Sequence, residues 1–176
     1  VPMSLSKQTP ERIVKPQISV CIATYNGEKH VIPQVASILE QIDNGDEVIV
    51  TDDHSTDRTL ERLNEFNDSR MRIYKNPTRL GHVRNFERAI ALARGEIVFL
   101  SDQDDVWPQG RVDSMVAAIK NVHHPAVVVG DFLEVDEFGK AIDSANNARI
   151  LYSSQGNQPY RIIWAIASGR SKYYGC

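Results

Sequence analysis

The sequence predicts an α/β fold, a mostly parallel, doubly wound sheet with helices on both faces. Short apolar runs rich in β-branched residues alternate along the chain with segments whose apolar residues recur every three or four positions. Strands separated by helices run parallel, because each crossover helix returns the chain to the same end of the sheet. The 176 residues, 41% hydrophobic and 24% charged, are enough for one sizeable core.

Two strand-helix units open the predicted fold. Residues 18–23 and 47–51 are apolar runs typical of buried strands. Each precedes a segment with helical spacing of apolar residues, 31–42 and 60–66. Cap residues for the second helix are available at 55–57, which reads Ser-Thr-Asp.

The same pattern continues through the middle of the chain. A short strand is predicted at 71–74, and Val83, Phe86, Ile90 and Ala93 line one face of a helix that ends at Gly95. The next elements are predicted as a strand at 97–100, a helix at 112–122 and a strand at 126–130.

The last third of the chain predicts less regular structure. Residues 132–142 indicate a hairpin of two short strands, with the turn at 137–140. The polar tract 144–158 indicates a loop, and the apolar spacing in 161–167 indicates an amphipathic helix. We expect a polar N-terminal extension at 1–16, a ligand-binding domain at 17–143, and at 144–176 a loop and helix that lead into an incomplete second region.

An acidic cluster directly follows the apolar run 97–100. It reads Ser101-Asp102-Gln103-Asp104-Asp105, so it places three carboxylates at the carboxyl end of a buried strand. Carboxylate ligands suit Mg²⁺ or Mn²⁺, which usually keep positions open for water and phosphate oxygens. The alternative is an acidic turn that caps the following helix.

Three polar clusters follow predicted strands and should meet at one edge of the sheet. They are 24–27 (Thr-Tyr-Asn-Gly), 52–55 (Asp-Asp-His-Ser) and 102–105 (Asp-Gln-Asp-Asp). Ligands of open α/β sheets bind beyond the carboxyl ends of the strands. The sequence therefore predicts a binding site for a small molecule at this edge.

Individual side chains in these clusters suit a nucleotide. Tyr25 offers a face for stacking a base, or it is a half-buried edge aromatic. Asp53 can accept a hydrogen bond from a ring N–H, while Asp52 is expected to brace the loop; either can instead cap the following helix. Among the arginines of the third crossover we select Arg84 to approach a diphosphate.

Several other classes of protein are poorly supported. The chain has no GxGxxG, GxxxxGK[ST], HExxH or GxSxG motif, so dinucleotide folds, P-loop enzymes, zinc proteases and serine hydrolases are disfavoured. A net charge of -3 with scattered Lys and Arg argues against nucleic acid as a partner. Cys21 and Cys176 do not suggest a disulfide framework, and we expect a reducing compartment.

Five blocks of sequence resemble family 2 glycosyltransferases when taken in order. They are 18–27 (ISVCIATYNG), 48–57 (VIVTDDHSTD), 81–85 (GHVRN), 93–100 (ARGEIVFL) and 102–107 (DQDDVW). The resemblance covers roughly residues 17 to 145. The DQDDVW form is similar to bacterial rhamnosyltransferase-like enzymes that build surface polysaccharides.

This resemblance implies a GT-A fold, a nucleotide-diphosphate-sugar donor and inverting transfer to an acceptor hydroxyl of a saccharide or a lipid-linked saccharide. It places Ala23 and Tyr25 along the base, with Asp53 reading it, and Asp102 near the ribose or sugar. Asp104, with Asp102, would hold Mn²⁺ or Mg²⁺. The full set of expected nucleotide-sugar-binding residues is Ala23, Thr24, Tyr25, Asn26, Asp53, Arg84, Asp102 and Gln103.

Two departures from the family pattern bear on function. His54 replaces the usual small residue after the paired aspartates, which can change the turn or bring an imidazole near the base. The family's catalytic base normally comes later in the chain, and we expect it beyond Cys176. The alternatives are a nucleotide-sugar-binding protein or partner subunit without the base, and a receiver-like phosphoacceptor domain. We expect a cytoplasmic protein, soluble or peripheral at the inner face of the membrane.

Overall fold

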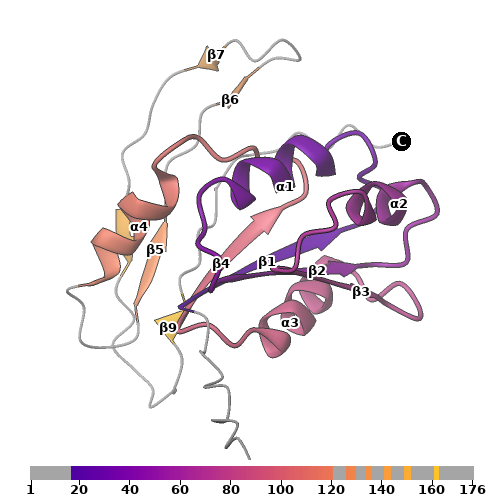
Figure 1. Cartoon of the computed structure of the whole chain (residues 1–176), viewed down its shortest axis with the longest axis horizontal. Coiled ribbons are helices and arrows are strands. Elements are labelled where there is room, and N and C mark those ends of the chain that lie inside the picture. The colour runs from indigo at the N-terminus through magenta and orange to yellow at the C-terminus, as the bar shows by residue number, and fades with distance from the viewer. Residues whose placement is uncertain are drawn as a thin grey trace, which may run out of the picture.

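The computed structural model has a five-stranded parallel sheet with the strand order β3-β2-β1-β4-β9 (Figure 1). The structure describes residues 17–120 and 126–129, together with the short strands at 134–135, 141–143, 149–151 and 161–162. Neighbouring strands in this sheet all pair in parallel. The predicted α/β fold is therefore confirmed.

The first eight elements form four successive strand-helix units. Their bounds are β1 (Ile18–Thr24), α1 (Val31–Leu39), β2 (Glu47–Asp52), α2 (Thr59–Asn64), β3 (Met71–Lys75), α3 (His82–Leu92), β4 (Ile97–Asp102) and α4 (Arg111–Lys120). The later strands are β5 (Val127–Val129), β6 (Glu134–Val135), β7 (Ala141–Asp143), β8 (Arg149–Leu151) and β9 (Arg161–Ile162). β6 and β7 pair antiparallel, which confirms the predicted hairpin.

Helices cover both faces of the sheet because alternate side chains of each strand point to opposite faces. On one face, Val20, Ile22 and Phe99 pack with buried residues of α1, α2 and α4. On the other face, Cys21 and Ile49 pack with residues that include Phe86 and Ala89 of α3. Figure 1 shows α1 and α3 on opposite sides of the sheet.

Two predictions for the C-terminal third were wrong where the structure describes it. Residues 149–151, predicted as loop, form β8, which pairs antiparallel with β5. Arg161 and Ile162, predicted as the start of a helix, form β9 beside β4. Adjacent apolar residues are compatible with a strand or a helix, and here the open edge of β4 supplies backbone partners. The rest of the predicted helix lies outside the described residues.

Helix α3 also differs from its prediction. It ends at Leu92, before Gly95, and Val83 is 69% exposed instead of buried. Its buried residues are Asn85, Phe86 and Ala89. The polar Asn85 therefore faces the core, where the sequence pattern had placed the apolar Val83.

An ion-pair network around one buried carboxylate joins the strands at the amino end of the sheet. The carboxylate of Glu47 on β2 is 3% exposed and accepts hydrogen bonds from Ser19 Oγ at 2.6 Å and from the backbone N–H of Arg94 at 2.8 Å. The guanidinium groups of Arg72 and Arg94 complete the network. This network lies at the opposite end of the strands from the predicted site, so its role is structural.

Candidate functional site

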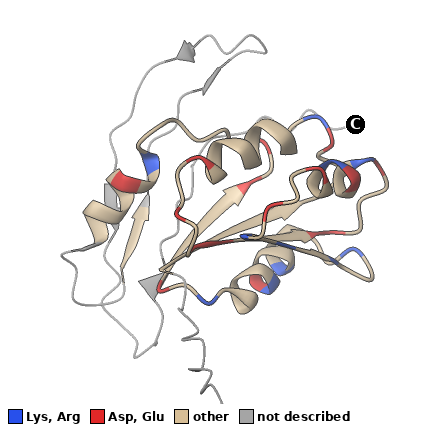
Figure 2. Cartoon of the chain, viewed as in Figure 1, with Lys and Arg blue, Asp and Glu red and all other residues tan. Residues whose placement is uncertain are grey.

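The three predicted polar clusters meet at the carboxyl edge of the sheet. In the strand register Thr24 pairs with Asp52, and Ala23 pairs with Asp102. Figure 2 shows acidic residues at the carboxyl end of β4 and basic residues in the loop between β3 and α3. The prediction that these segments converge is confirmed.

The loop after β1 is fastened to the loop after β2 by side chains. The backbone N–H of Asn26 donates to Ser55 Oγ at 2.9 Å, and Asn26 Oδ1 accepts from the backbone N–H of Thr56 at 2.9 Å. The N–H of Gly27 donates to Thr59 Oγ1 at 2.8 Å. Asn26 has a φ of 49°, a left-handed conformation that asparagine tolerates better than most residues. These bonds hold the two loops as one unit.

Asp52 braces this unit from inside, as predicted. Its fully buried carboxylate accepts hydrogen bonds from Thr24 Oγ1 at 3.0 Å and from the backbone N–H of Ser55 at 2.9 Å. Asp57 accepts from the N–H of Thr59, the first residue of α2, at 3.0 Å. Of the three predicted caps, Asp57 alone serves the helix, while the Ser55 and Thr56 side chains bond to other loop residues.

Asp53 anchors the loop between β3 and α3. Its carboxylate is almost fully buried and accepts from Asn76 Nδ2 at 2.9 Å, Leu80 N at 2.6 Å and Gly81 N at 2.8 Å. Burial favours a higher pKa for Asp53, but these hydrogen bonds and the nearby Arg79 outweigh it and lower the pKa. Three of roughly four acceptor positions of the carboxylate are thus used within the chain.

Two asparagines that we did not single out complete this anchor. Asn76 Nδ2 also donates to Asn85 Oδ1 at 2.9 Å, and Asn85 Nδ2 donates to the carbonyl of Thr51 at 2.8 Å. Both asparagines are buried. The sequence offered one signal for Asn85: it is a polar residue, next to Arg84, inside a helix with apolar spacing.

Arg79, not Arg84, contacts a predicted ligand-binding residue. The guanidinium of Arg79 lies over the Tyr25 ring, 3.9 Å from its centre. Arg84 is exposed on α3. Arg88 donates to the carbonyl of Lys75 at 3.3 Å and so supports the loop. The role of Arg84 at a diphosphate remains a prediction. Arg79 is added to the candidate site because the loop after β3 places it over the Tyr25 ring.

The acidic turn after β4 presents its carboxylates to solvent. Asp102 is half-exposed and its Oδ1 lies 3.1 Å from His82 Nε2, while Asp104 and Asp105 are also exposed. Partial loss of hydration around the carboxyl group, together with the negative charges of Asp102 and Asp104, raises the pKa of Asp105. Within the described residues, His, Cys, Asp and Glu form no group of three that could hold a metal by themselves.

Gln103, unlike these exposed carboxylates, uses both of its side-chain polar atoms within the chain. Its Oε1 accepts from the backbone N–H of Tyr25 at 2.9 Å, and its Nε2 donates to the carbonyl of Tyr25 at 3.2 Å. Gln103, a predicted ligand-binding residue, therefore bonds to the backbone of Tyr25, which is another predicted ligand-binding residue. Direct contact of its amide with a nucleotide sugar stays a prediction.

The far end of the acidic turn is held by Trp107. This side chain is 3% exposed, and its ring centre lies 5.4 Å from that of Phe99 on β4. Its backbone N–H donates to Ser37 Oγ at 2.9 Å. The tryptophan thus fixes the turn onto α1, so Asp104 and Asp105 are displayed on a short segment held at both ends.

His54 lies in the turn after the paired aspartates and has a left-handed backbone conformation. It adopts a φ of 66°, a conformation in which histidine is found more often than most residues other than glycine. Its Nδ1 lies 3.2 Å from the carbonyl oxygen of Asn76, and the side chain is exposed. Both predicted effects of His54, a changed turn and an imidazole near the base, stay predictions.

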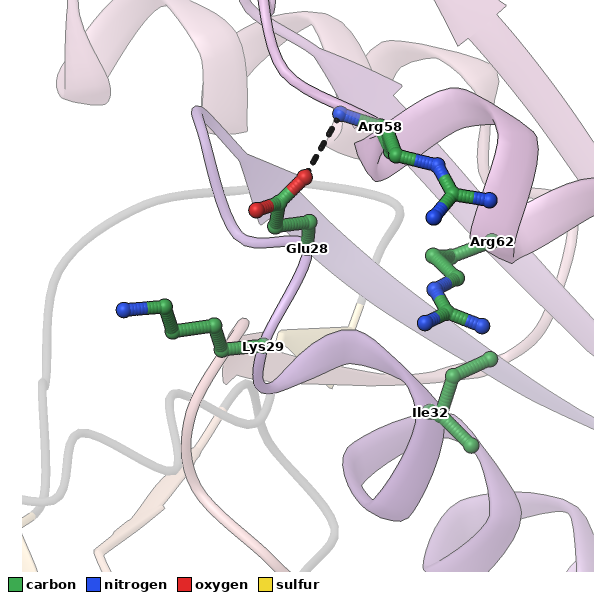
Figure 3. Close-up of a pocket in the computed structure, with 5 residues that line it drawn as sticks. All are labelled: Glu28, Lys29, Ile32, Arg58 and Arg62. Atoms are coloured by element: carbon green, nitrogen blue, oxygen red, sulfur yellow. Dashed lines mark hydrogen bonds between the residues drawn. The ribbon is translucent and has the colours of Figure 1, made fainter.

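A separate surface hollow of about 430 Å³ lies beside the loops after β1 and β2 (Figure 3). It is lined by Glu28, Lys29, Ile32, Arg58 and Arg62. Arg58 pairs with Glu61 at 2.6 Å, and Arg62 pairs with Glu65 at 3.3 Å. No residue predicted to bind a nucleotide sugar lines this hollow, so we do not assign it to the same site.

The parallel sheet with helices on both faces is the GT-A type fold that the chain shares with solved glycosyltransferase structures. The chain belongs to glycosyltransferase family 2, because the sequence model of the family described as "Glycosyl transferase family 2" matches residues 19–172. No helix in the described part of the chain has the length and apolar character needed to span a membrane.

Two curated bacterial relatives illustrate the likeness. The dTDP-rhamnosyl transferase RfbG of Shigella flexneri is 34% identical over 102 residues, which are 54% of this chain and 35% of RfbG. The UDP-Glc:alpha-D-GlcNAc-diphosphoundecaprenol beta-1,3-glucosyltransferase WfgD of Escherichia coli is 28% identical over 100 residues, 57% of this chain and 40% of WfgD. The chain spans 38% to 49% of the length of the first four relatives.

Two solved structures share the fold. S. aureus TarS 1-349 in complex with UDP-GlcNAc matches with a TM-score of 0.61 and 28% identity, over 66% of this chain and 34% of that one. The mannosyltransferase PcManGT from Pyrobaculum calidifontis, in complex with GDP-Man and Mn²⁺, matches with a TM-score of 0.57 and 28% identity, over 68% and 36%.

Proposed function

We propose that this chain is the donor-binding part of an inverting glycosyltransferase that acts in bacterial cell-surface polysaccharide synthesis. The observation that carries the proposal is the meeting of Tyr25, Asp53 and the acidic turn of Asp102 to Asp105 at one edge of the sheet. An aromatic ring at one end and exposed carboxylates at the other match the two ends of a nucleoside diphosphate.

The base-binding end is built from Ala23, Tyr25 and Asp53. A base would stack on the Tyr25 ring, on the face that Arg79 leaves free or in exchange with Arg79. The acceptor position left on Asp53 can take a hydrogen bond from a ring N–H such as that of uracil or thymine. Thr24 and Asn26 shape the loop, and their contact with the nucleotide would be through the backbone, because their side chains bond within the protein.

The metal-binding end is built from Asp102 and Asp104. Their exposed carboxylates lie on one short turn and are the oxygen ligands that Mn²⁺ and Mg²⁺ prefer. Two protein ligands fit an ion whose other positions are filled by diphosphate oxygens and water. When bound, the ion would stabilise the negative charge that builds on the departing diphosphate.

The names of the relatives support a nucleotide-sugar donor without selecting one. They include a UDP-Glc and a dTDP-rhamnosyl enzyme, and the structural neighbours hold UDP-GlcNAc and GDP-Man. We propose a lipid-linked saccharide as the acceptor of this chain, because the name of WfgD includes one. We further propose that the general base comes from sequence beyond Cys176, because the relatives are more than twice as long as the matched region.

Calorimetric binding of UDP, dTDP and GDP to the 176-residue chain, each with Mn²⁺ and with a chelator, tests this function. We expect one diphosphate to bind more tightly than the others, and its affinity to fall when the metal is removed. A folded chain that binds none of the three would overturn the proposal. Equal binding with and without metal would leave a nucleotide site but remove the metal from it.

A further inference from the structure

We propose that Gln103 is a positioning residue that couples the metal-binding end of the donor site to its base-binding end. The inference rests on the proposed function, since it concerns the same site. It differs from the expectation that Gln103 touches the nucleotide sugar. Gln103 acts instead through the backbone of Tyr25, which is 78 residues away in the sequence.

The geometry of the amide is what distinguishes Gln103 from its acidic neighbours. Its oxygen accepts from the N–H of Tyr25 and its nitrogen donates to the carbonyl of the same residue, at 2.9 and 3.2 Å. Both polar atoms of one side chain thus bond to the two backbone polar groups of one residue, Tyr25. Glutamine suits this arrangement because it combines a donor and an acceptor at the required length, whereas a carboxylate can only accept.

Gly27 provides the space that this contact needs. A Cβ atom at Gly27 would lie 2.7 Å from Gln103 Cδ and 3.2 Å from Val31 Cγ1, and it would also collide with Gln103 Oε1. Gly27 does not have a positive φ, so its backbone alone does not require glycine. The absence of a side chain at Gly27 is therefore explained by the position of Gln103.

Gln103 lies between the two residues proposed to hold the metal. A cation bound to Asp102 and Asp104 would restrict the turn from both sides and hold the Gln103 amide against Tyr25. The Tyr25 ring would then be presented to the base in one position. The coupling is reciprocal, so a bound base should also increase the affinity for the cation.

The first test compares the wild-type chain with Gln103→Met. Methionine keeps the length and bulk of the side chain but removes both hydrogen bonds. The quantity to measure is the ratio of UDP affinity with Mn²⁺ to UDP affinity with a chelator, because a local loss of packing would lower both affinities together. We expect the ratio to fall by roughly fivefold or more in the variant, the lower end of typical coupling between sites.

The second test is a double-mutant cycle with Gly27→Ala. The added methyl group should displace the Gln103 side chain and lower UDP affinity in the presence of Mn²⁺. In the Gly27→Ala/Gln103→Ala double variant the collision is gone, so the affinity should be no lower than that of Gln103→Ala alone. Such non-additivity is expected of residues that are in contact or physically coupled, and not of distant, independent sites.

The outcomes separate this inference from the function on which it rests. If the wild-type chain binds neither UDP, dTDP nor GDP, the proposed function fails. If the wild-type chain shows metal-dependent binding and Gln103→Met keeps the same affinity ratio, the coupling role is wrong. Circular dichroism and thermal unfolding of each variant show that the comparison is between folded proteins. Where dTDP or GDP binds more tightly than UDP, that nucleotide replaces it in both tests.

Discussion

The guanidinium carbon of Arg79 lies 3.9 Å from the centre of the Tyr25 ring. The contact joins the loop after β3 to the loop after β1, two segments that are separated by more than fifty residues. Arg79 also contributes to the low pKa of Asp53. One arginine therefore touches the proposed stacking residue and acts electrostatically on the residue proposed to read the base.

Replacement of Tyr25 by alanine should weaken UDP binding by about 1–3 kcal/mol, the usual contribution of an aromatic ring that stacks on a base. Tyr25→Phe keeps the ring and serves as the matched control, with affinity near that of wild type. Arg79→Ala should have a smaller effect, about 0.5–1 kcal/mol for an exposed cation over a ring. Calorimetry gives all three values, and an unchanged affinity in Tyr25→Ala would remove the stacking role.

Replacement of Asp104 by asparagine should abolish the metal dependence of nucleotide binding while leaving the fold intact. A neutral amide is a poorer ligand for a hard divalent cation than a carboxylate. Asp113→Asn, at an exposed position in the first turn of α4, removes the same charge away from the turn and should behave as wild type. Manganese dependence that persists in Asp104→Asn would argue against this ligand assignment.

The stability of the fold should fall at acid pH through Glu47. Burial favours a higher pKa for Glu47, but hydrogen bonds from Ser19 and Arg94 and the charge of Arg72 outweigh it and lower the pKa below its ordinary 4.5. The unfolded chain therefore binds the proton more readily. The stabilising contribution is complete above pH 4.5 and is lost as the pH falls through the folded-state pKa.

Urea unfolding of wild type and Glu47→Gln at a series of pH values checks this expectation. The variant should be less stable at pH 7, and the difference from wild type should narrow as the pH falls below 4.5. Glu87→Gln, at an exposed position of α3, is the control and should follow the wild-type curve. A difference that stays constant with pH would show that the Glu47 charge does not carry the effect.

Gly95 is expected to resist substitution by alanine. A Cβ atom there would lie 2.6 Å from the backbone nitrogen of Ser19 and 2.7 Å from the carbonyl carbon of Ile18. These atoms belong to a central strand and cannot move aside cheaply, so we expect a loss of roughly 1–3 kcal/mol in the free energy of unfolding. Gly45→Ala, which would meet nothing within 4 Å, should change stability by less than about 0.5 kcal/mol. Similar effects in both variants would contradict the argument.

The regular elements of the first 120 residues could be predicted because each follows a local pattern. The apolar runs of β1, β2 and β4 are fully buried apart from Asp102 at the end of β4, as their composition indicates. The strands at 149–151 and 161–162 were missed because their pairing partners, β5 and β4, are distant in the sequence. A short segment becomes a strand when another strand edge receives it, and local periodicity carries no information about that edge.

Some residues of the candidate site could likewise be predicted from the sequence, and others could not. Carboxylates, Tyr25 and Asn26 could be assigned to one edge of the sheet because each cluster directly follows a predicted strand. Arg79 could not be preferred over Arg84, since the path of the loop after β3 depends on hydrogen bonds to Asp53. Nothing local indicated that Gln103 would bond to Tyr25, because the two residues are 78 positions apart and meet only when β1 and β4 pair.

The sequence by itself determined the α/β class, the order of the strand-helix units and the chemical groups at the carboxyl edge of the sheet, because these depend on residues that are close along the chain. Only the tertiary structure decided which of those groups face solvent and which hold the loops together. Asp52, Asp53 and Gln103 have polar side chains much like those of Asp102 and Asp104, yet they bond inside the protein. Their direction is set by partners 23 to 78 residues away, which are brought near only when the sheet forms.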